Sequence, residues 1–446
     1  MKTRTVCKNL CSSILLLSAF FIYSCSNELE DNLSSKENKE FTLKLSVDEA
    51  NALKIKKTGS YVISEEDAIE MILKGFTKEA QSRSKSSFVV KSCKKIDFPS
   101  TNKIEKDKKP EGYYVVDFIH ENKEGFSIVS ADKRIEQVLA YSEQGSLNDT
   151  IYNEGLKIFY QGLSHYMENQ VKEFNTDSLY NAALSKLTFS RNGWIDDGNF
   201  HYYYAPYGFT VDPDYEYMGE EIITHEGSEI GDILTTRWSQ NYPYNNKLPN
   251  ITANQKAYAG CTLIAMIQIM AYHKKPYGTV TATDWARFTQ SFQCYEEELQ
   301  DCILSIFNEI EKKSVDTLGT DISLPSAWIF LNRNGYLATL HENYNSNTMK
   351  LPVLVRGDSG TGTAGHVWVI DSKRITTYVT YDKYEKDDGY DVWRIYVEKL
   401  EEYGPLYVHC NWGYGGSSDG WYINNAFSSY NNFDYSQNTR MINIQP

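Results

Sequence analysis

The segment that decides the fold is residues 258–266, which read YAGCTLIAM. The small residues Ala259 and Gly260 form a turn that leads into an apolar pattern typical of a buried helix. Cys261 is therefore expected at a helix N-terminus. There the unpaired backbone N–H groups and the helix dipole favour the thiolate, which is the nucleophilic form of cysteine. The segment predicts a reactive thiol.

Two later segments add a histidine and an asparagine. His366 leads into the strand-like run 367–371, VWVID, and Asn411 opens the loop 411–420, NWGYGGSSDG. Taken alone, these residues have simpler explanations: a small buried cysteine, a core histidine and a turn. Glycines beside the histidine and the asparagine allow close approach of a substrate, and the chain order is Cys, His, Asn. Together they favour a catalytic set.

These segments resemble the streptopain-like cysteine proteases, which share the papain order of catalytic residues. The matching stretches are 238–245 with its glutamine, 260–273 with the cysteine, 365–371 with the histidine, the glycine-rich loop 411–420, and the propeptide-like stretches 125–134 and 139–142. The loop 411–420 is the most specific of them. The resemblance covers roughly residues 45–150 and 230–446.

The resemblance implies an α+β fold: a papain-like cysteine protease domain with a helical half and an antiparallel β half, preceded by an α+β propeptide-like domain. It also implies the roles of five residues. Cys261 is the nucleophile, His366 is its acid and base, Asn411 accepts from the imidazole, Trp412 shields that contact or takes part in it, and Gln240 donates to the oxyanion. No cofactor or metal is implied.

Two departures from the family pattern concern the surroundings of these residues. Thr262, Leu263 and Ile264 follow the nucleophile where the family commonly has small residues. The loop 356–365 before the histidine is long and polar. Neither change removes a reacting atom. The resemblance does not, however, decide how side chains pack beneath the cysteine or which substrate subsites lie on the histidine side.

We expect five parts along the chain. They are a signal peptide (1–24), a polar tether (25–44), a propeptide-like inhibitory domain (45–150), a helical and acidic connecting segment (151–229) and the catalytic domain (230–446). In the propeptide-like part the pattern predicts a helix after Ser64 and a hairpin of 113–119 with 125–130. Residues 150–190 look helical, and 194–229 are expected to be solvated and accessible to proteases.

The catalytic region shows helical patterns before strand patterns. The helix from Cys261 is expected to stop near Pro276, and residues 292–311 suggest a second helix. The expected strands are 351–355, 365–371, 378–381, 392–397 and 407–411. The cysteine would come from the helical half and the histidine from the β half.

The N-terminal residues predict export. Basic residues precede the apolar run 14–23, which is long enough for a signal peptide and too short to span a membrane. The run ends in 22–25, IYSC, which resembles a bacterial lipoprotein box and predicts a lipid anchor at Cys25. The expected location is the outer membrane or the cell surface, with release after processing left open.

Composition and net charge exclude some classes of protein. The net charge of −14 argues against nucleic-acid binding, and 41% hydrophobic residues are ample for packed cores. Without those of the signal and Cys25, an odd number of cysteines remains, so one thiol is expected to be free. Cys294 and Cys302 could form a disulfide or stay as two thiols. Their spacing indicates no metal site.

Three functions are consistent with these residues. The favoured one is an exported cysteine endopeptidase made as a zymogen, whose partners are protein or peptide substrates and its own propeptide-like domain. A cell-wall hydrolase or acyl transferase would use the same thiol and imidazole but would not explain the propeptide-like segment. A catalytically idle surface protein that binds or inhibits proteases would be favoured only if Cys261 or His366 were replaced, and both are present. The family resemblance also implies a hydrophobic P2 residue in the substrate.

Overall fold

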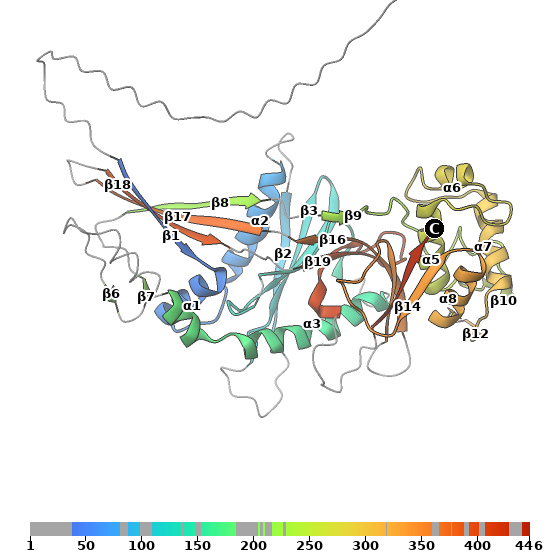
Figure 1. Ribbon diagram of the computed structural model, residues 1–446, viewed down its shortest axis with the longest axis horizontal. Coiled ribbons are helices and arrows are strands. Elements are labelled where there is room, and N and C mark those ends of the chain that lie inside the picture. Colours follow the sequence, from blue (N-terminus) through green and yellow to red (C-terminus); the bar gives the residue numbers. More distant parts are fainter. Residues whose placement is uncertain are drawn as a thin grey trace, which may run out of the picture.

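The structure, a computed structural model, combines helices with sheets that are antiparallel except for one parallel pair of strands, so the expected α+β class is confirmed. It describes residues 38–80, 88–98, 109–135, 137–147, 153–183, 204–205, 208–209, 216–225, 229–317, 319–358, 365–375, 377–387, 392–400, 406–427 and 439–446. The expected signal peptide, Cys25 and most of the tether lie outside these residues. In Figure 1 the helices α5 to α8 gather at one end, a large sheet fills the middle, and α1 lies toward the other end.

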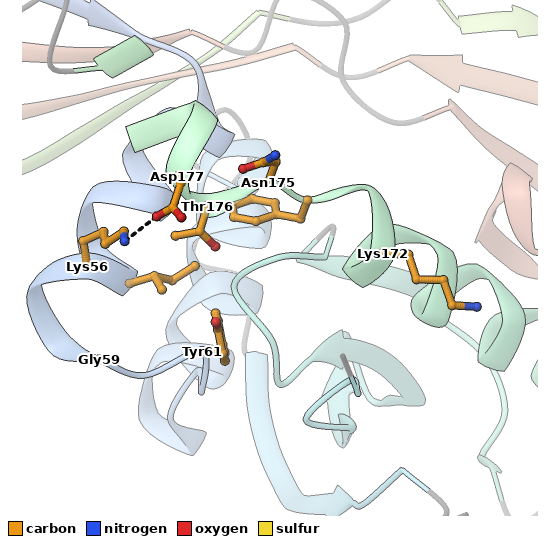
Figure 2. Close-up of a pocket in the computed structure, with 9 residues that line it drawn as sticks. Lys56, Gly59, Tyr61, Lys172, Asn175, Thr176 and Asp177 are labelled. Atoms are coloured by element: carbon orange, nitrogen blue, oxygen red, sulfur yellow. Dashed lines mark ion pairs between the residues drawn. The ribbon is translucent and has the colours of Figure 1, made fainter. Parts of the chain in front are cut away.

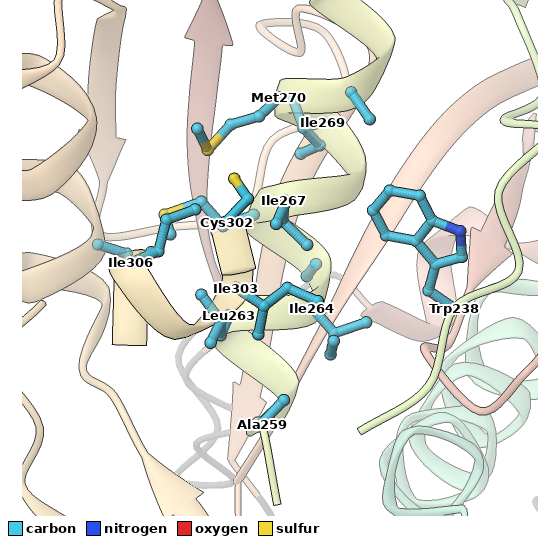
Figure 3. Packing of buried hydrophobic residues seen from close by; sticks show 14 of the residues in the cluster. Trp238, Ala259, Leu263, Ile264, Ile267, Ile269, Met270, Cys302, Ile303 and Ile306 are labelled. Atoms are coloured by element: carbon cyan, nitrogen blue, oxygen red, sulfur yellow. The ribbon is translucent and has the colours of Figure 1, made fainter. Parts of the chain in front are cut away.

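The helical half is built around α5 (Cys261–His273), which is apolar almost throughout and therefore buried on all sides. Around it pack α6 (Ala282–Phe288), α7 (Glu297–Glu309) and α8 (Leu324–Arg333). Figure 3 shows Cys302, Ile303 and Ile306 of α7 beside α5 and Trp238 on another side of it. The helix ends at Lys274 in the left-handed conformation, two residues before Pro276, as the sequence predicts.

An antiparallel sheet of 11 strands runs through both the catalytic and the propeptide-like regions. Its order is β14 (Leu337–His341), β21 (Arg440–Gln445), β15 (Val353–Asp358), β16 (Gly365–Ile375), β19 (Leu406–Asn411), β20 (Gly420–Ile423), β5 (Val138–Ser142), β4 (Lys123–Ser130), β3 (Tyr113–His120) and β2 (Phe88–Ile96), with β9 (Glu229–Gly231) beside β16. The two regions join where β20 pairs with β5, Trp421 opposite Tyr141.

Two hydrophobic cores cover the two faces of this sheet. Val367 and Val369 of β16 face the core formed with α5, whereas Trp368 and Ile370 face a second core. Side chains alternate along a strand, so a strand covered on both faces is apolar throughout. The second core is closed by α3 (Glu154–Glu173) and the short helix η3 (Asn424–Phe427). The helix in the expected connecting segment is therefore packed into a core.

The propeptide-like region has the helix and hairpin that the sequence predicts. The helix is α2 (Glu65–Ala80), and the hairpin is formed by β3 and β4. The patterns did not indicate α1 (Val47–Thr58), whose low amphipathicity hides it, although Ser46 and Glu49 form a capping box at its start. A small core of Ile63, Ala68, Ile72, Val116 and Val129 holds α2 against the strands.

A second sheet changes two expected boundaries. It has the order β1 (Asn38–Leu45), β18 (Val392–Leu400), β17 (Thr377–Asp387) and β8 (Glu216–His225). Strand β1 takes up the end of the expected tether and runs one residue past it, and β8 falls within the expected solvated stretch. Pairing with strands distant in the chain makes these polar segments strands, which local periodicity does not reveal.

Short paired segments complete the fold. They are β6 (Tyr204–Ala205) with β7 (Gly208–Phe209), β10 (Asn250–Thr252) with β11 (Gln255–Lys256), and β12 (Ser314–Val315) with β13 (Thr320–Asp321). The pair β12 and β13 matters for the site, because Thr320 lies against the turn that precedes α5.

Candidate active site

Cys261 is the first residue of α5, as predicted. The turn before it depends on Gly260, which has φ 89°, and a Cβ there would lie 2.5 Å from the carbonyl oxygen of Thr320. Only glycine combines this backbone conformation with so close an approach. The N-cap provides no side-chain hydrogen bond, so no capping side chain satisfies the unpaired N–H groups of the first turn beside Cys261.

The surroundings of Cys261 favour its thiolate. Burial by itself would raise the pKa of this thiol. The hydrogen bond and the charge of His366, the backbone N–H of Val367 and the charge of Arg356 outweigh burial and hold the pKa of Cys261 below its usual value. A thiol with a lowered pKa is more often present as the nucleophile at neutral pH.

His366 comes from β16 and forms a hydrogen bond with the Cys261 thiol. Its Nε2 lies 2.8 Å from the carbonyl oxygen of Trp412. A carbonyl only accepts, so Nε2 carries a proton, and the second ring nitrogen, Nδ1, is left for the Cys261 thiol. The imidazole is 2% exposed and stacks on Tyr414, with the two ring centroids 5.2 Å apart.

Within the described part of the chain, Asn411 makes no hydrogen bond to the imidazole, whose Nε2 donates to the Trp412 carbonyl, so the prediction that Asn411 accepts directly from His366 is wrong. Its Nδ2 donates to the carbonyl oxygen of Thr236 at 2.7 Å, and its Oδ1 accepts from the N–H of Gly413 at 3.2 Å. The side chain is thus bound to the backbone of Thr236 and to that of its own loop. Trp412 makes the direct contact instead, through its carbonyl rather than its ring.

Gln240 lies beside the nucleophile turn. Its carbonyl accepts from the N–H of Ala259 at 3.0 Å, two residues before Cys261. The preceding residue, Ser239, pairs with Tyr414 of the glycine-rich loop. The half-buried side chain of Gln240 makes no hydrogen bond within the described part of the chain, so its amide is available to a ligand. The structure thus gathers Cys261, His366, Trp412 and Gln240 in one place.

The loop 411–420 is held by a carboxylate that the sequence reasoning did not single out. Asp419 Oδ1 accepts from the N–H of Trp412 at 2.9 Å. Burial raises the pKa of Asp419 to about 7, while the Trp412 N–H and the charges of His409 and Arg237 oppose the shift. His409 in turn donates from Nδ1 to Asp371 at 2.7 Å. The sequence feature that could have pointed to this carboxylate is the aspartate in the motif SSDG of the same loop.

The N-terminal region touches the histidine side at several points. A Cβ on Gly155, at the start of α3, would lie 3.1 Å from Cδ2 of His366 and would also collide with the ring of Trp412. Glu154 donates its N–H to the Tyr414 hydroxyl at 3.4 Å. The Ser142 hydroxyl donates to the carbonyl oxygen of Asp419 at 2.7 Å. No periodicity in the sequence indicates these contacts.

Other features of the described part of the chain lie away from this site. The other described cysteines are free thiols like Cys261, namely Cys93, Cys294, Cys302 and Cys410. Cys294 and Cys302, for which the sequence left a disulfide or two thiols open, are therefore unpaired. Within the described ranges, no group of three or more His, Cys, Asp or Glu side chains could hold a metal ion. An open pocket of about 520 Å³ lies between α1 and the end of α3. Figure 2 shows Lys56 and Asp177 in its lining, which form an ion pair with a distance of 2.5 Å.

Comparisons with known proteins agree with the two regions. Residues 60–167 match the family described as Spi protease inhibitor, and residues 238–320 match the Peptidase C10 family. The chain is 24% identical over 317 residues to the thiol protease/hemagglutinin PrtT of Porphyromonas gingivalis. That match covers 68% of this chain and 33% of PrtT, so the chain spans about a third of the length of this curated relative.

Among solved structures, a prointerpain A fragment of Prevotella intermedia is similar at 18% identity and a TM-score of 0.41. The similarity covers 79% of this chain and 98% of the fragment.

Proposed function

We propose, from the premise that this chain carries a domain of the Peptidase C10 (streptopain) family, that it is a cysteine endopeptidase made as a zymogen. The observation that carries the proposal is the pairing of Cys261, at the start of α5, with His366, whose far nitrogen is held by the Trp412 carbonyl. A buried thiol with a purely structural role does not need this arrangement.

In the proposed reaction, the Cys261 thiolate attacks the carbonyl carbon of the scissile peptide bond. The proton of the thiol resides on His366 Nδ1, and the imidazolium gives it to the leaving amine as the C–N bond breaks. The acyl group is then bound to Cys261 as a thioester. His366 next takes a proton from a water molecule, the hydroxide attacks the thioester, and the acid product leaves as the thiolate returns.

Two donors are proposed to stabilise the oxyanion that forms in each step. One is the N–H of Cys261 at the start of the helix, and the other is the side-chain amide of Gln240. Removal of one such donor lowers the rate of comparable enzymes by roughly 10²–10³. The amide of Gln240 satisfies one requirement for this role, since no group in the described part of the chain occupies it.

Latency is proposed to come from the region that precedes the catalytic domain. Gly155 and Glu154 of α3 lie against His366 and Tyr414, and β5 extends the catalytic sheet at β20. A covalently attached domain acts at high effective concentration, so it inhibits even when its intrinsic affinity is modest. Cleavage between this region and residue 230 would turn the contact into one that dilution can break.

Labelling with an epoxide inhibitor of cysteine proteases, followed by peptide mapping, tests the proposal. We expect the label on Cys261 of the processed chain, and loss of both label and peptide hydrolysis in Cys261→Ala and His366→Ala. Cys93→Ala is the control, because burial and neighbouring carboxylates raise the pKa of that thiol to about 11.

Two results would contradict the proposal. One is turnover above about a hundredth of wild type in Cys261→Ala or His366→Ala, since loss of such groups costs far more in related chemistry. The other is an uncut preparation, verified by mass, that hydrolyses a peptide as fast as the processed chain. The first result would contradict the assignment as a cysteine protease. The second would contradict only the proposal that the uncut chain is a latent zymogen.

Export as a lipoprotein is a separate proposal, supported by the N-terminal sequence. The basic and apolar residues before Cys25 fit a lipoprotein signal, and Cys25 would carry the lipid. In the described part of the chain, no helix has the length and apolar character needed to cross a membrane.

A further inference from the structure

Gln268 lies on the nucleophile helix about two turns after Cys261 and is completely buried. Its Oε1 accepts from the N–H of Trp238 at 3.2 Å. A backbone N–H only donates, so this contact fixes which end of the amide is the oxygen. The amide nitrogen of Gln268 is thereby directed to Asn411.

Asn411 and Gln268 form a reciprocal pair of amides. Gln268 Nε2 donates to Asn411 Oδ1 at 3.3 Å, and Asn411 Nδ2 donates to Gln268 Oε1 at 3.3 Å. The orientation of Asn411 is fixed independently by two backbone groups, the carbonyl of Thr236 and the N–H of Gly413. Both amides therefore have one arrangement in which all partners are satisfied.

The pair reaches His366 through a single peptide unit. The N–H of Gly413, which donates to Asn411 Oδ1, belongs to the same planar peptide as the carbonyl of Trp412. That carbonyl accepts from His366 Nε2 at 2.8 Å. A rotation of this peptide would move the carbonyl away from the imidazole, and Asn411 holds the opposite edge of the peptide.

We propose that Gln268 is a positioning residue for the Cys261–His366 pair. The hydrogen bonds form a closed circuit that begins and ends on α5, which carries both Cys261 and Gln268. Gln268 binds Asn411, and Asn411 binds the peptide between Trp412 and Gly413. The carbonyl of that peptide orients His366 toward Cys261. The circuit links the helical half to the β half beside the reacting atoms. This inference rests on the proposed function, because it assigns a role within the same thiolate–imidazolium pair.

A buried hydrogen-bonded glutamine could serve stability alone, so the test needs a readout of the pair itself. That readout is the pH dependence of the rate at which iodoacetamide alkylates Cys261 in the full chain, followed by peptide mapping. The thiolate is the reacting species, and iodoacetamide is small enough to react with this half-buried thiol. Full-chain protein avoids any assumption about the catalytic domain alone.

In wild type we expect alkylation of Cys261 to remain fast well below the ordinary thiol pKa of about 8.5. Gln268→Met removes both amide contacts at similar volume and should shift the rise in rate to higher pH. A shift of about one pH unit corresponds to a rate about tenfold lower at pH 6. Met270→Ala, a buried change on the same helix outside the circuit, is the control for general destabilisation.

Gln268→Glu covers the case in which Gln268→Met does not fold. A glutamate keeps the acceptor for Trp238 and for the Asn411 amide but places a second oxygen against Asn411 Oδ1, so the profile should shift in the same direction. A profile of either folded variant that superimposes on wild type overturns the positioning role. A wild-type profile of an ordinary thiol overturns the proposed function, and the inference with it.

Discussion

His366 depends on a backbone carbonyl for its orientation, and this has consequences for which side chains matter. The Trp412 carbonyl is positioned from two sides, by the Asp419 carboxyl at the N–H of Trp412 and by Asn411 at the N–H of Gly413. Neither group touches the imidazole. Substitutions at Asn411 and Asp419 should thus act on the geometry of the site and not on its chemistry.

Because of Asp419, we expect the free energy of unfolding to depend on pH. Its folded-state pKa of about 7 lies above the ordinary value of 3.8, so the folded state retains this proton more strongly than the unfolded state does. The resulting stability is complete below pH 3.8 and is lost as the pH rises to about 7. Asp419→Asn keeps an acceptor for the Trp412 N–H without the ionisation.

We therefore expect the free energy of unfolding of wild type to fall relative to that of Asp419→Asn between pH 4 and 7, and the difference to stay constant above about pH 7. Denaturant unfolding of both proteins in a Cys261→Ala background measures it without self-cleavage. Glu311→Gln, an exposed change, is the control. A difference that does not vary with pH would show that Asp419 ionises as it does in the unfolded chain.

At the scale of elements, α3 connects the propeptide-like region to the catalytic core. Its apolar side chains, including Leu156 and Phe159, pack with Trp368, Trp412 and Phe427 on the face of the sheet opposite α5. Removal of this helix would expose these aromatic rings. The helix therefore belongs to the same packed core as Trp368 and Trp412, and its first turn is a neighbour of His366.

Gly155→Ala should lower the stability of the uncut chain. The added methyl group would meet the Trp412 ring and lie 3.1 Å from the imidazole, and overpacking of this kind typically costs about 1–3 kcal/mol. Gln161→Ala on the exposed side of the same helix is the matched control. The measurement is denaturant unfolding in the Cys261→Ala background. Equal stability of the two variants would mean that the start of α3 does not press on the site.

At the scale of the whole molecule, two regions share one sheet. The β20–β5 pairing makes the propeptide-like strands an extension of the catalytic sheet, so backbone hydrogen bonds as well as side chains hold the regions together. In the order of the sheet, β3 and β2 are the last two strands on the side beyond β20, β5 and β4. Separation after cleavage would have to break this edge pairing as well as the packing of α3.

Membrane attachment is a prediction about the whole chain. If Cys25 carries a lipid, Cys25→Ala should move the protein from the detergent phase to the aqueous phase, because a lipid chain provides the membrane affinity. Detergent partitioning of cells that express each form measures this, and Cys93→Ala serves as the control cysteine change. Unchanged partitioning of Cys25→Ala would rule out the anchor.

The sequence was sufficient for the features that depend on local pattern and side-chain chemistry. An apolar run after a glycine turn predicted α5 with Cys261 at its start, the strand-like run 367–371 predicted β16 with His366, and a proline predicted the end of α5. These features depend on residues that are close together in the chain, so they can be predicted from the sequence alone. The α+β class and the resemblance to the streptopain-like proteases rest on the same segments.

Only the tertiary structure decided which groups meet across the chain. Asn411 follows Cys261 and His366 in the expected order, yet its side chain binds backbone groups and Gln268, and the carbonyl of Trp412 faces the imidazole. Every residue has a carbonyl, so no sequence pattern marks the one that orients a histidine. The same holds for β8 and for Gly155, because strand pairing and close contact are set by segments far away in sequence.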